Sequence, residues 1–304
     1  MTLRVGTRAS SLSRRQTDWV VKQLRGVDPR LEFQVVAVRT AGDRSRRPIP
    51  ELGGAGWFTR ELERALADGV VDLVVHSLKD LPTEPTPGLV VAAVPTREDP
   101  RDCLVGPWPT LDALPAGARV GTTSPRRKAQ LLAYRRDLQV VPLRGNVDTR
   151  LRKVEAGEVD GAVLAAAGLV RGGWQDRIRQ LLDPDVVLPA PAQGALAVQV
   201  REGDRALVEL ASRIDDATTH AAVRAERAFL RALGGGCTLP VGALATAETG
   251  RLRLRVRVLS EDGSRQVSVE QEGAPDDPER VGRQAADAVR PFLAVLGGAA
   301  WPRR

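Results

Sequence analysis

Cysteine is scarce in this sequence: its 304 residues include two, Cys103 and Cys237. So few thiols in so long a chain exclude a disulfide framework and are typical of a reducing compartment. Neither cysteine has His or Cys partners at metal-ligand spacing, so we expect no metal site. No apolar run approaches the roughly 20 residues of a membrane span, and residues 1–5 run into a strand-like segment rather than a signal peptide. We therefore expect a cytoplasmic protein.

Aromatic residues are also rare, at 3% of the chain. Basic residues outnumber acidic ones by 45 to 38, and all but four of the basic residues are arginine. A nucleic-acid binder needs stacking platforms and basic runs, and the sequence has neither. Glycine-rich phosphate loops of the GxGxxG or Walker A type are missing as well, which disfavours a nucleotide ligand. Most of the arginines are expected to lie on a solvated surface, so the informative ones are those at special positions.

The first two-thirds of the chain alternates short apolar strands with amphipathic helices. Strands are predicted at 3–6, 33–39, 70–76, 89–94, 119–122, 139–143, 161–165 and 195–200, and helices at 11–25, 58–68, 126–134 and 148–156. Near-continuous apolar strands between helices predict parallel sheets covered on both faces.

Two punctuated segments, 95–100 and 188–194, suit crossovers between domains. The chain is therefore expected to leave a first domain, build a second and return, as in a two-lobed binding protein. The last ninety residues differ, because a helix at 216–233 is followed by a strictly alternating strand at 252–258 and a final helix at 278–296. Alternation with period two predicts a small antiparallel sheet. We predict domain 1 at 1–96 and 195–213, domain 2 at 97–194 and a C-terminal α+β domain at 214–304.

Arginines recur where the predicted strands end. Ligands of open α/β sheets bind beyond these carboxyl ends. Ser124 is a natural N-cap and Pro125 suits the first helical position, which puts Arg126 and Arg127 in the first turn of a helix. A cation is unfavourable there unless an anion lies beside it. Similar positions are occupied by Arg8, Arg144, Arg150 and Arg171. Guanidinium groups bind carboxylates bidentately, so a substrate with many carboxylates is favoured.

Asp80 and Lys79 follow another strand end, in His76-Ser-Leu-Lys-Asp-Leu-Pro82. An ordinary turn residue is the competing interpretation of Asp80. A carboxylate among arginines stays ionised, which suits a counter-charge for a cationic intermediate better than a proton source. We interpret His76 as structural, because no Ser-His-Asp pattern surrounds it.

Cys237 follows three glycines, which predict an exposed thiol suited to covalent attachment. Cys103 lies in a strand-like segment and is expected to be a buried apolar residue. Two other classes of function remain open from these patterns. A two-lobed anion-binding protein accounts for the arginines but for neither Asp80 nor the cysteine domain, and a nucleic-acid binder lacks aromatic residues and a basic helix.

Taken together, the segments resemble the porphobilinogen deaminase family over essentially the whole chain. The matching stretches, in order, are 6–10, 40–43, 76–82, 97–102, 121–127, 143–150, 166–169, 193–195, 226–227 and 235–240. Each stretch is short, but their order and spacing make the resemblance specific.

The resemblance implies two α/β domains like type II periplasmic binding proteins, plus a C-terminal α+β domain with an antiparallel sheet. It implies one dipyrromethane cofactor, joined by a thioether to Cys237. Four porphobilinogen molecules are then condensed with loss of ammonia, and water releases hydroxymethylbilane for tetrapyrrole and haem biosynthesis. The family further implies a monomeric cytoplasmic transferase with no nucleic-acid or membrane partner, and a transient hand-off to uroporphyrinogen-III synthase.

The family's functional residues map onto this sequence as follows. The catalytic acid maps to Asp80. Cofactor-binding positions map to Cys237, Lys79, Asp80, Thr122, Thr123, Ser124, Arg126, Arg127, Arg144, Asn146, Arg150 and Gln193. Substrate-binding positions map to Arg8, Ser10, Arg144, Arg150 and Arg171. The chain departs from the family at Ala55, which replaces the usual lysine of a mobile loop, and at Glu51, which replaces a commonly basic residue.

Overall fold

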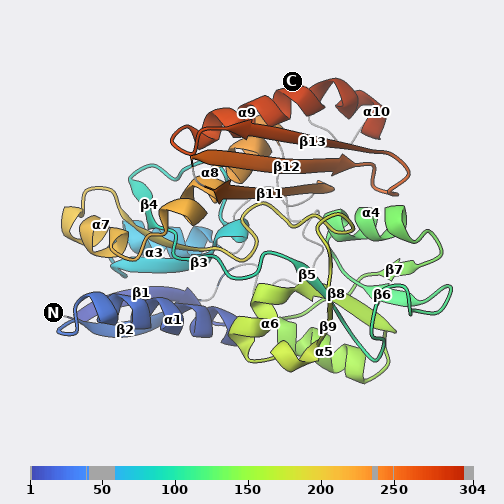
Figure 1. The fold of residues 1–304 in the computed structure, drawn as a ribbon. Helices are drawn as coiled ribbons and strands as arrows, with labels where there is room; N and C mark the ends of the chain where they lie inside the picture. The colour runs from blue at the N-terminus through green and yellow to red at the C-terminus, as the bar shows by residue number, and fades with distance from the viewer. Residues whose placement is uncertain (1, 39, 41–58, 235–238, 249, 298–304) are drawn as a thin grey trace. The chain divides into compact units, whose positions relative to one another are not determined.

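The computed structural model describes residues 2–38, 40, 59–234, 239–248 and 250–297. The chain divides into two compact units, each made of two stretches of sequence. Unit 1 comprises Met1–Glu98 and Ala195–His220, and unit 2 comprises Asp99–Gly194 and Ala221–Arg304. Figure 1 shows the elements of both units.

Unit 1 is built on a five-stranded sheet with the order β2-β1-β3-β10-β4. Its strands are β1 (Thr2–Arg8), β2 (Glu32–Val38), β3 (Leu73–Ser77), β4 (Leu89–Ala93) and β10 (Leu196–Arg201). Its helices are α1 (Ser11–Val27), α3 (Arg60–Ala67), the short 3-10 turn η2 (Leu78–Asp80) and α7 (Arg205–Ser212). Successive strand residues point to opposite faces, so Leu73 and Val75 pack with α1 and α7, while Val74 packs with α3. Both faces of the sheet are therefore covered, as predicted.

Unit 2 contains a second five-stranded sheet, with the order β7-β6-β8-β5-β9. Its strands are β5 (Asp102–Val105), β6 (Arg119–Gly121), β7 (Gln139–Val141), β8 (Gly161–Ala165) and β9 (Ile178–Leu181). Its helices are α4 (Pro125–Tyr134), α5 (Val147–Glu155), α6 (Ala166–Gly172) and the short η3 (Gln175–Arg177). Leu104 and Val163 belong to one apolar cluster and Cys103 and Leu164 to another, so this sheet also has two buried faces.

The prediction of parallel sheets is wrong in one respect, because both sheets are mixed. In unit 1, β10 runs antiparallel to β3 and β4. In unit 2, β5 runs antiparallel to β8 and β9. Both β5 and β10 come directly after a crossover segment, so each sheet has the same strand order, with the crossover strand inserted as the fourth member. Apolar strands report burial but not direction, which is why sequence patterning missed this.

The C-terminal part of unit 2 is a three-stranded antiparallel sheet with the order β11-β12-β13, as predicted. It comprises β11 (Val241–Glu248), β12 (Arg251–Leu259) and β13 (Gln266–Gly273), followed by α9 (Pro278–Val289), the 3-10 turn η4 (Arg290–Phe292) and α10 (Leu293–Gly297). The apolar residues of β12 are buried against α8 (Ala217–Ala232) and α9, while its arginines alternate outward. The predicted helix at 278–296 is interrupted at Pro291, which cannot donate a backbone hydrogen bond. Two α/β sheets and one small antiparallel sheet confirm the predicted fold class.

Candidate active site

The carboxyl ends of β1 and β3 bring Arg8 and Asp80 together. These strands are parallel neighbours, with Gly6 opposite Val74, so both end at the same edge of the sheet. β3 runs into η2, whose last residue is Asp80. Arg8 and Asp80 line one small pocket within unit 1, together with Ser13, Thr59, Leu62, Val75, His76 and Ser77. Arg8 and Asp80, predicted at the ends of two strands that open on the same cleft, therefore line one pocket.

The neighbours of these residues follow local rules. Ser10 is the N-cap of α1, and its hydroxyl accepts a hydrogen bond from the Ser13 backbone N–H at 3.2 Å. Lys79 precedes Asp80 within η2, and both are partly exposed. These side chains are accessible to a ligand that enters from solvent.

The first turn of α4 carries the predicted arginine pair in unit 2. Ser124 caps the helix by accepting from the Arg127 N–H, and Pro125 occupies the first position. Both guanidinium groups converge on the carboxylate of Asp102 in β5. Arg126 Nη1 donates to Oδ2 at 2.6 Å, and Arg127 Nη2 donates to Oδ1 at 2.7 Å. The anion that the helix terminus required is thus supplied by the chain itself.

Gln193 completes this cluster, because its side-chain amide donates to Asp102 Oδ1 at 2.9 Å and to the Pro100 carbonyl at 2.8 Å. Asp102 is fully buried, and Arg126 and Arg127 are 3% and 6% exposed. We call Asp102, Arg126, Arg127 and Gln193 the buried arginine cluster. Asp102 is the residue that sequence reasoning missed. It lay inside the matched stretch 97–102, but nothing local marks it as buried.

Electrostatics explain how the cluster is balanced. Burial raises the pKa of the Asp102 carboxyl, but the charges of Arg126 and Arg127 outweigh this effect and hold that pKa well below its usual range. Burial lowers the pKa of the Arg126 guanidinium, and the negative charge of Asp102 partly offsets this decrease. Two cations against one anion leave a formal charge of +1. Arg126 Nε is also buried and has no hydrogen-bond partner within the described part of the chain. Buried unpaired N–H groups are costly, so the cluster fits an additional carboxylate.

Other predicted residues follow strands of the same sheet. Thr122 is buried, and its hydroxyl accepts from the Ser124 N–H at 3.2 Å. Thr123, Arg144 and Asn146 are exposed. Arg150 donates from Nε to the Gly145 carbonyl at 2.8 Å, and Arg171 lies in the last turn of α6. Since β6, β7 and β8 are parallel, these residues gather beyond one edge of the unit 2 sheet.

Three predicted positions lie outside the described residues: Cys237, Ala55 and Glu51. The other cysteine is confirmed as a buried apolar residue. Cys103 is fully buried in β5, and burial raises the pKa of its thiol to about 12. A thiol with so high a pKa is not a nucleophile near neutral pH.

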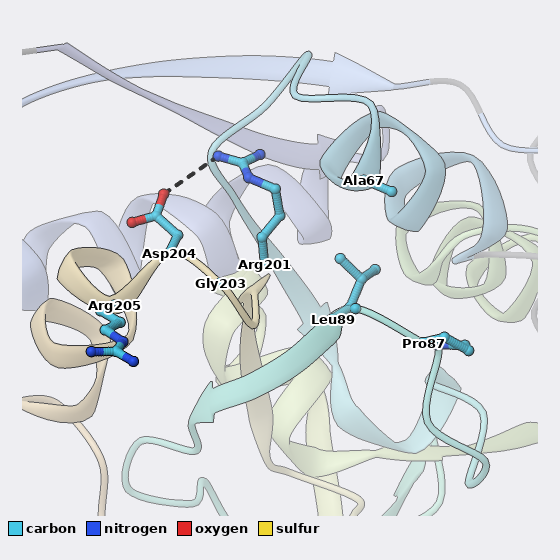
Figure 2. A pocket seen from close by; sticks show the side chains of 8 residues that line it. Ala67, Pro87, Leu89, Arg201, Gly203, Asp204 and Arg205 are labelled. Atoms are coloured by element: carbon cyan, nitrogen blue, oxygen red, sulfur yellow. Dashed lines mark ion pairs between the residues drawn. The ribbon is translucent and has the colours of Figure 1, made fainter.

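A larger groove in unit 1 is not the candidate site. It has a volume of about 610 Å³ and is lined by Pro87, Leu89, Arg201, Asp204 and Arg205, among others (Figure 2). The guanidinium of Arg201 donates to the carbonyls of Leu66 and Val71 and pairs with Asp204 at 3.5 Å. The guanidinium of Arg201 is therefore already paired with groups of the protein itself.

No group of three or more potential metal ligands occurs among the described residues. Within the same residues, none of the helices is both long enough and apolar enough to cross a membrane.

Two family models match the sequence. The dipyromethane cofactor binding domain of porphobilinogen deaminase matches residues 3–209, and the C-terminal domain of porphobilinogen deaminase matches residues 220–290. The chain belongs to the porphobilinogen deaminase family. The first model covers both α/β sheets, and the second covers the region of the antiparallel sheet.

Individual relatives agree with this membership. The porphobilinogen deaminase of Pelotomaculum thermopropionicum is 50% identical over 285 residues, which cover 93% of this chain and 91% of that protein. The porphobilinogen deaminase of Thermus thermophilus is 50% identical over 284 residues, covering 93% of each.

Solved structures with a similar fold include the methionine binding protein MetQ and the VFT2 domain of Bordetella pertussis BvgS. MetQ has a TM-score of 0.42 and 14% identity, and the match covers 70% of this chain and 89% of MetQ. The BvgS domain has a TM-score of 0.40 and 16% identity, with coverage of 70% and 86%.

Proposed function

We propose that this protein catalyses the stepwise condensation of four porphobilinogen molecules with loss of ammonia, followed by hydrolytic release of hydroxymethylbilane. The enzyme is then a transferase of tetrapyrrole and haem biosynthesis. The observation that carries this proposal is membership of the porphobilinogen deaminase family, with about half of all residues identical to relatives over more than nine-tenths of the chain.

The cofactor of the family is dipyrromethane, and the residues present suit it. We propose that Cys237 holds it through a thioether. When bound, it would supply the terminal pyrrole that accepts the first porphobilinogen unit. Each pyrrole carries an acetate and a propionate, and the buried arginine cluster offers a formal charge of +1 and an unpartnered N–H to such groups. The proposed cofactor-binding side chains are those of Lys79, Asp80, Thr122, Thr123, Ser124, Arg126, Arg127, Arg144, Asn146, Arg150 and Gln193.

Substrate carboxylates are assigned to arginines that remain accessible. Arg8, Arg144, Arg150 and Arg171 are at least partly exposed, and each guanidinium can bind a carboxylate bidentately. Ser10 adds a hydroxyl at the N-terminus of α1, where the helix dipole favours an anion. Distributed cations of this kind hold a product chain that becomes more negative with each condensation.

Asp80 is the proposed catalytic residue. As the aminomethyl nitrogen of porphobilinogen leaves as ammonia, positive charge develops on the pyrrole. The Asp80 carboxylate accepts a hydrogen bond from the pyrrole N–H and stabilises that charge. Arg8 lines the same pocket and adds a positive charge near the carboxylate. Losing one preorganised electrostatic group of this type costs about 10²–10³ in rate.

We also propose that the enzyme is a cytoplasmic monomer that passes hydroxymethylbilane to uroporphyrinogen-III synthase. Domain 1 is assigned to 1–96 and 195–213, domain 2 to 97–194 and the cofactor-carrying domain to 214–304. Separate family models match residues 3–209 and 220–290, which supports a domain boundary between residues 209 and 220.

Intact mass spectrometry tests the proposed function. The purified protein is expected to carry a covalent increment equal to two pyrrole units, and Cys237→Ala is expected to lose both the increment and product formation. Cys103→Ala is the matched control, since it removes the other thiol and should keep the increment. Active enzyme with the mass of the bare polypeptide would contradict the proposal.

A further inference from the structure

The three residues before Lys79 and Asp80 are each hydrogen-bonded to another segment of unit 1. The Leu78 backbone N–H donates to the Ala195 carbonyl at 3.0 Å. The Ser77 hydroxyl donates to Gln16 Oε1 of α1 at 3.0 Å. His76 Nε2 lies 3.0 Å from Gln199 Oε1 of β10. The end of β3 and the first residue of the turn that carries Asp80 are therefore held by α1 and by the segment 195–199.

The contact of His76 continues into a buried polar chain. Gln199 Nε2 donates to Glu63 Oε1 at 3.0 Å, and the Thr86 hydroxyl donates to the same oxygen at 2.8 Å. His76, Gln199 and Glu63 are 4%, 3% and 7% exposed. Polar groups buried to this degree are costly unless they are hydrogen-bonded. This chain of hydrogen bonds runs from Glu63 in α3, through Gln199 in β10, to His76 near the end of β3.

The carboxylate at one end of this chain sets the direction of every hydrogen bond. Glu63 Oε1 accepts from both Gln199 and Thr86, so Gln199 turns its amide nitrogen toward Glu63. Its carbonyl oxygen then faces His76, and the imidazole must carry a proton on Nε2. The chain of hydrogen bonds that starts at Glu63 on α3 therefore favours the Nε2–H tautomer of His76.

We infer that Glu63 and Gln199 are positioning residues for Asp80, acting through His76. His76 lines the same pocket as Arg8 and Asp80, and its strand leads directly into the turn that carries Asp80. An imidazole held in one orientation keeps both this wall of the pocket and the end of β3 in place. This inference rests on the catalytic role proposed for Asp80.

Histidine-selective ¹⁵N NMR tests the first half of the inference. The chain has two histidines, and His220 serves as the internal reference because its Nδ1 contacts Asp215 at 2.9 Å. We expect an Nε2–H signal from His76 that is lost or exchange-broadened in Gln199→Leu. Glu63→Gln should weaken it, because an amide both donates and accepts and so no longer fixes the orientation of the Gln199 amide. An Nδ1–H tautomer of His76 in the native protein would overturn the inference.

Kinetics test the second half. Small misplacements of a catalytic group cost up to about 10²-fold, so we expect Gln199→Leu to lower kcat by roughly tenfold or more with little change in KM. Cofactor loading, measured by intact mass, should remain complete. Gln23→Leu, which changes an exposed glutamine of α1, is the matched control. If Gln199→Leu does not fold, Gln199→Asn breaks the same two hydrogen bonds with less change in polarity.

Asp80→Asn, measured alongside, separates the two possible failures. Loss of turnover in Asp80→Asn with native kcat in loaded Gln199→Leu overturns the positioning role alone. Native turnover in Asp80→Asn overturns the role proposed for Asp80 and the inference that depends on it. Loss of kcat in both, with a smaller loss in Glu63→Gln, supports the inference.

Discussion

Asp102→Asn is the substitution with the largest effect expected from the structure. The Asp102 carboxylate accepts hydrogen bonds from Arg126 Nη1, from Arg127 Nε and Nη2, and from Gln193 Nε2. In the variant, one carboxylate oxygen becomes an NH₂ group that faces guanidinium donors. The formal charge of the buried arginine cluster rises from +1 to +2 with no solvent to screen it. The substitution therefore removes one or three of the four acceptor contacts, depending on which oxygen is replaced, and leaves two buried cations without their counter-charge.

Breaking a buried ion pair by removing one partner costs about 3–5 kcal/mol. We expect Asp102→Asn to lower the free energy of unfolding by about that amount, measured by urea denaturation with circular dichroism. For a unit of this size, each kcal/mol corresponds to roughly 2–4 °C in Tm. Incomplete cofactor loading, seen by intact mass, should accompany the loss, because Arg126 and Arg127 lose their orientation.

Asp99→Asn is the matched control for this experiment. Asp99 pairs with Arg101 at 2.6 Å, but both side chains are partly exposed to water. Solvent-exposed pairs contribute about 0–1 kcal/mol, so this variant should stay within about 1 kcal/mol of the native protein. A similarly small effect of Asp102→Asn would refute the reasoning from burial.

Three further predictions follow from described residues. The folded-state pKa of Asp102 is depressed, so its contribution to the free energy of unfolding is present above the unfolded pKa of about 3.9 and is lost as the pH falls from there through the folded-state pKa. Urea titrations at several pH values should show this loss on the acid side in the native protein and less of it in Asp102→Asn. Ala192 has φ of +60° and is fully buried, so Ala192→Val should lower the free energy of unfolding by about 2–3 kcal/mol, whereas Ala192→Gly should not. Cys103 should resist alkylation by iodoacetamide in the folded protein and react after denaturation, and rapid labelling of the native protein would contradict its burial.

Much of the fold could be predicted because local patterns carry it. The alternation at 252–258 became β12, with its four apolar residues buried and its arginines outward. Ser124 and Pro125 start α4 as capping rules require. By contrast, β9 was missed, since its partly exposed sequence Ile-Arg-Gln-Leu gives no strong apolar signal. The direction of β5 and β10 depends on where the chain re-enters a sheet, which no local pattern records.

The candidate site, like the fold, could be predicted only in part. Arg126 and Arg127 were found because a cation in the first turn of a helix requires an anion. Their nearest anion was not found, because Asp102 lies 24 residues from Arg126 in a strand that reads as apolar. Gln199 was missed for a similar reason: it lies in a buried strand, 123 residues from His76. Contacts between residues that are distant in the sequence produce no periodic pattern from which they could be predicted.

The buried arginine cluster is itself held by the segment that precedes β10. Glu226 of α8 is fully buried, and its carboxylate accepts hydrogen bonds from the backbone N–H groups of Ala192 and Ala245, the latter at 2.7 Å in β11. Ala192 adopts a left-handed conformation that is unfavourable for an L-residue, and its neighbour Gln193 donates to Asp102. A strained residue persists only where surrounding contacts impose it. The strain at Ala192 is therefore explained by the hydrogen bonds on both sides of it: Glu226 holds its N–H from the side of β11, and the next residue, Gln193, is held by Asp102 between the two arginines. The start of the C-terminal sheet and the two buried arginines are consequently connected through Glu226, the backbone of residues 192–193 and Asp102.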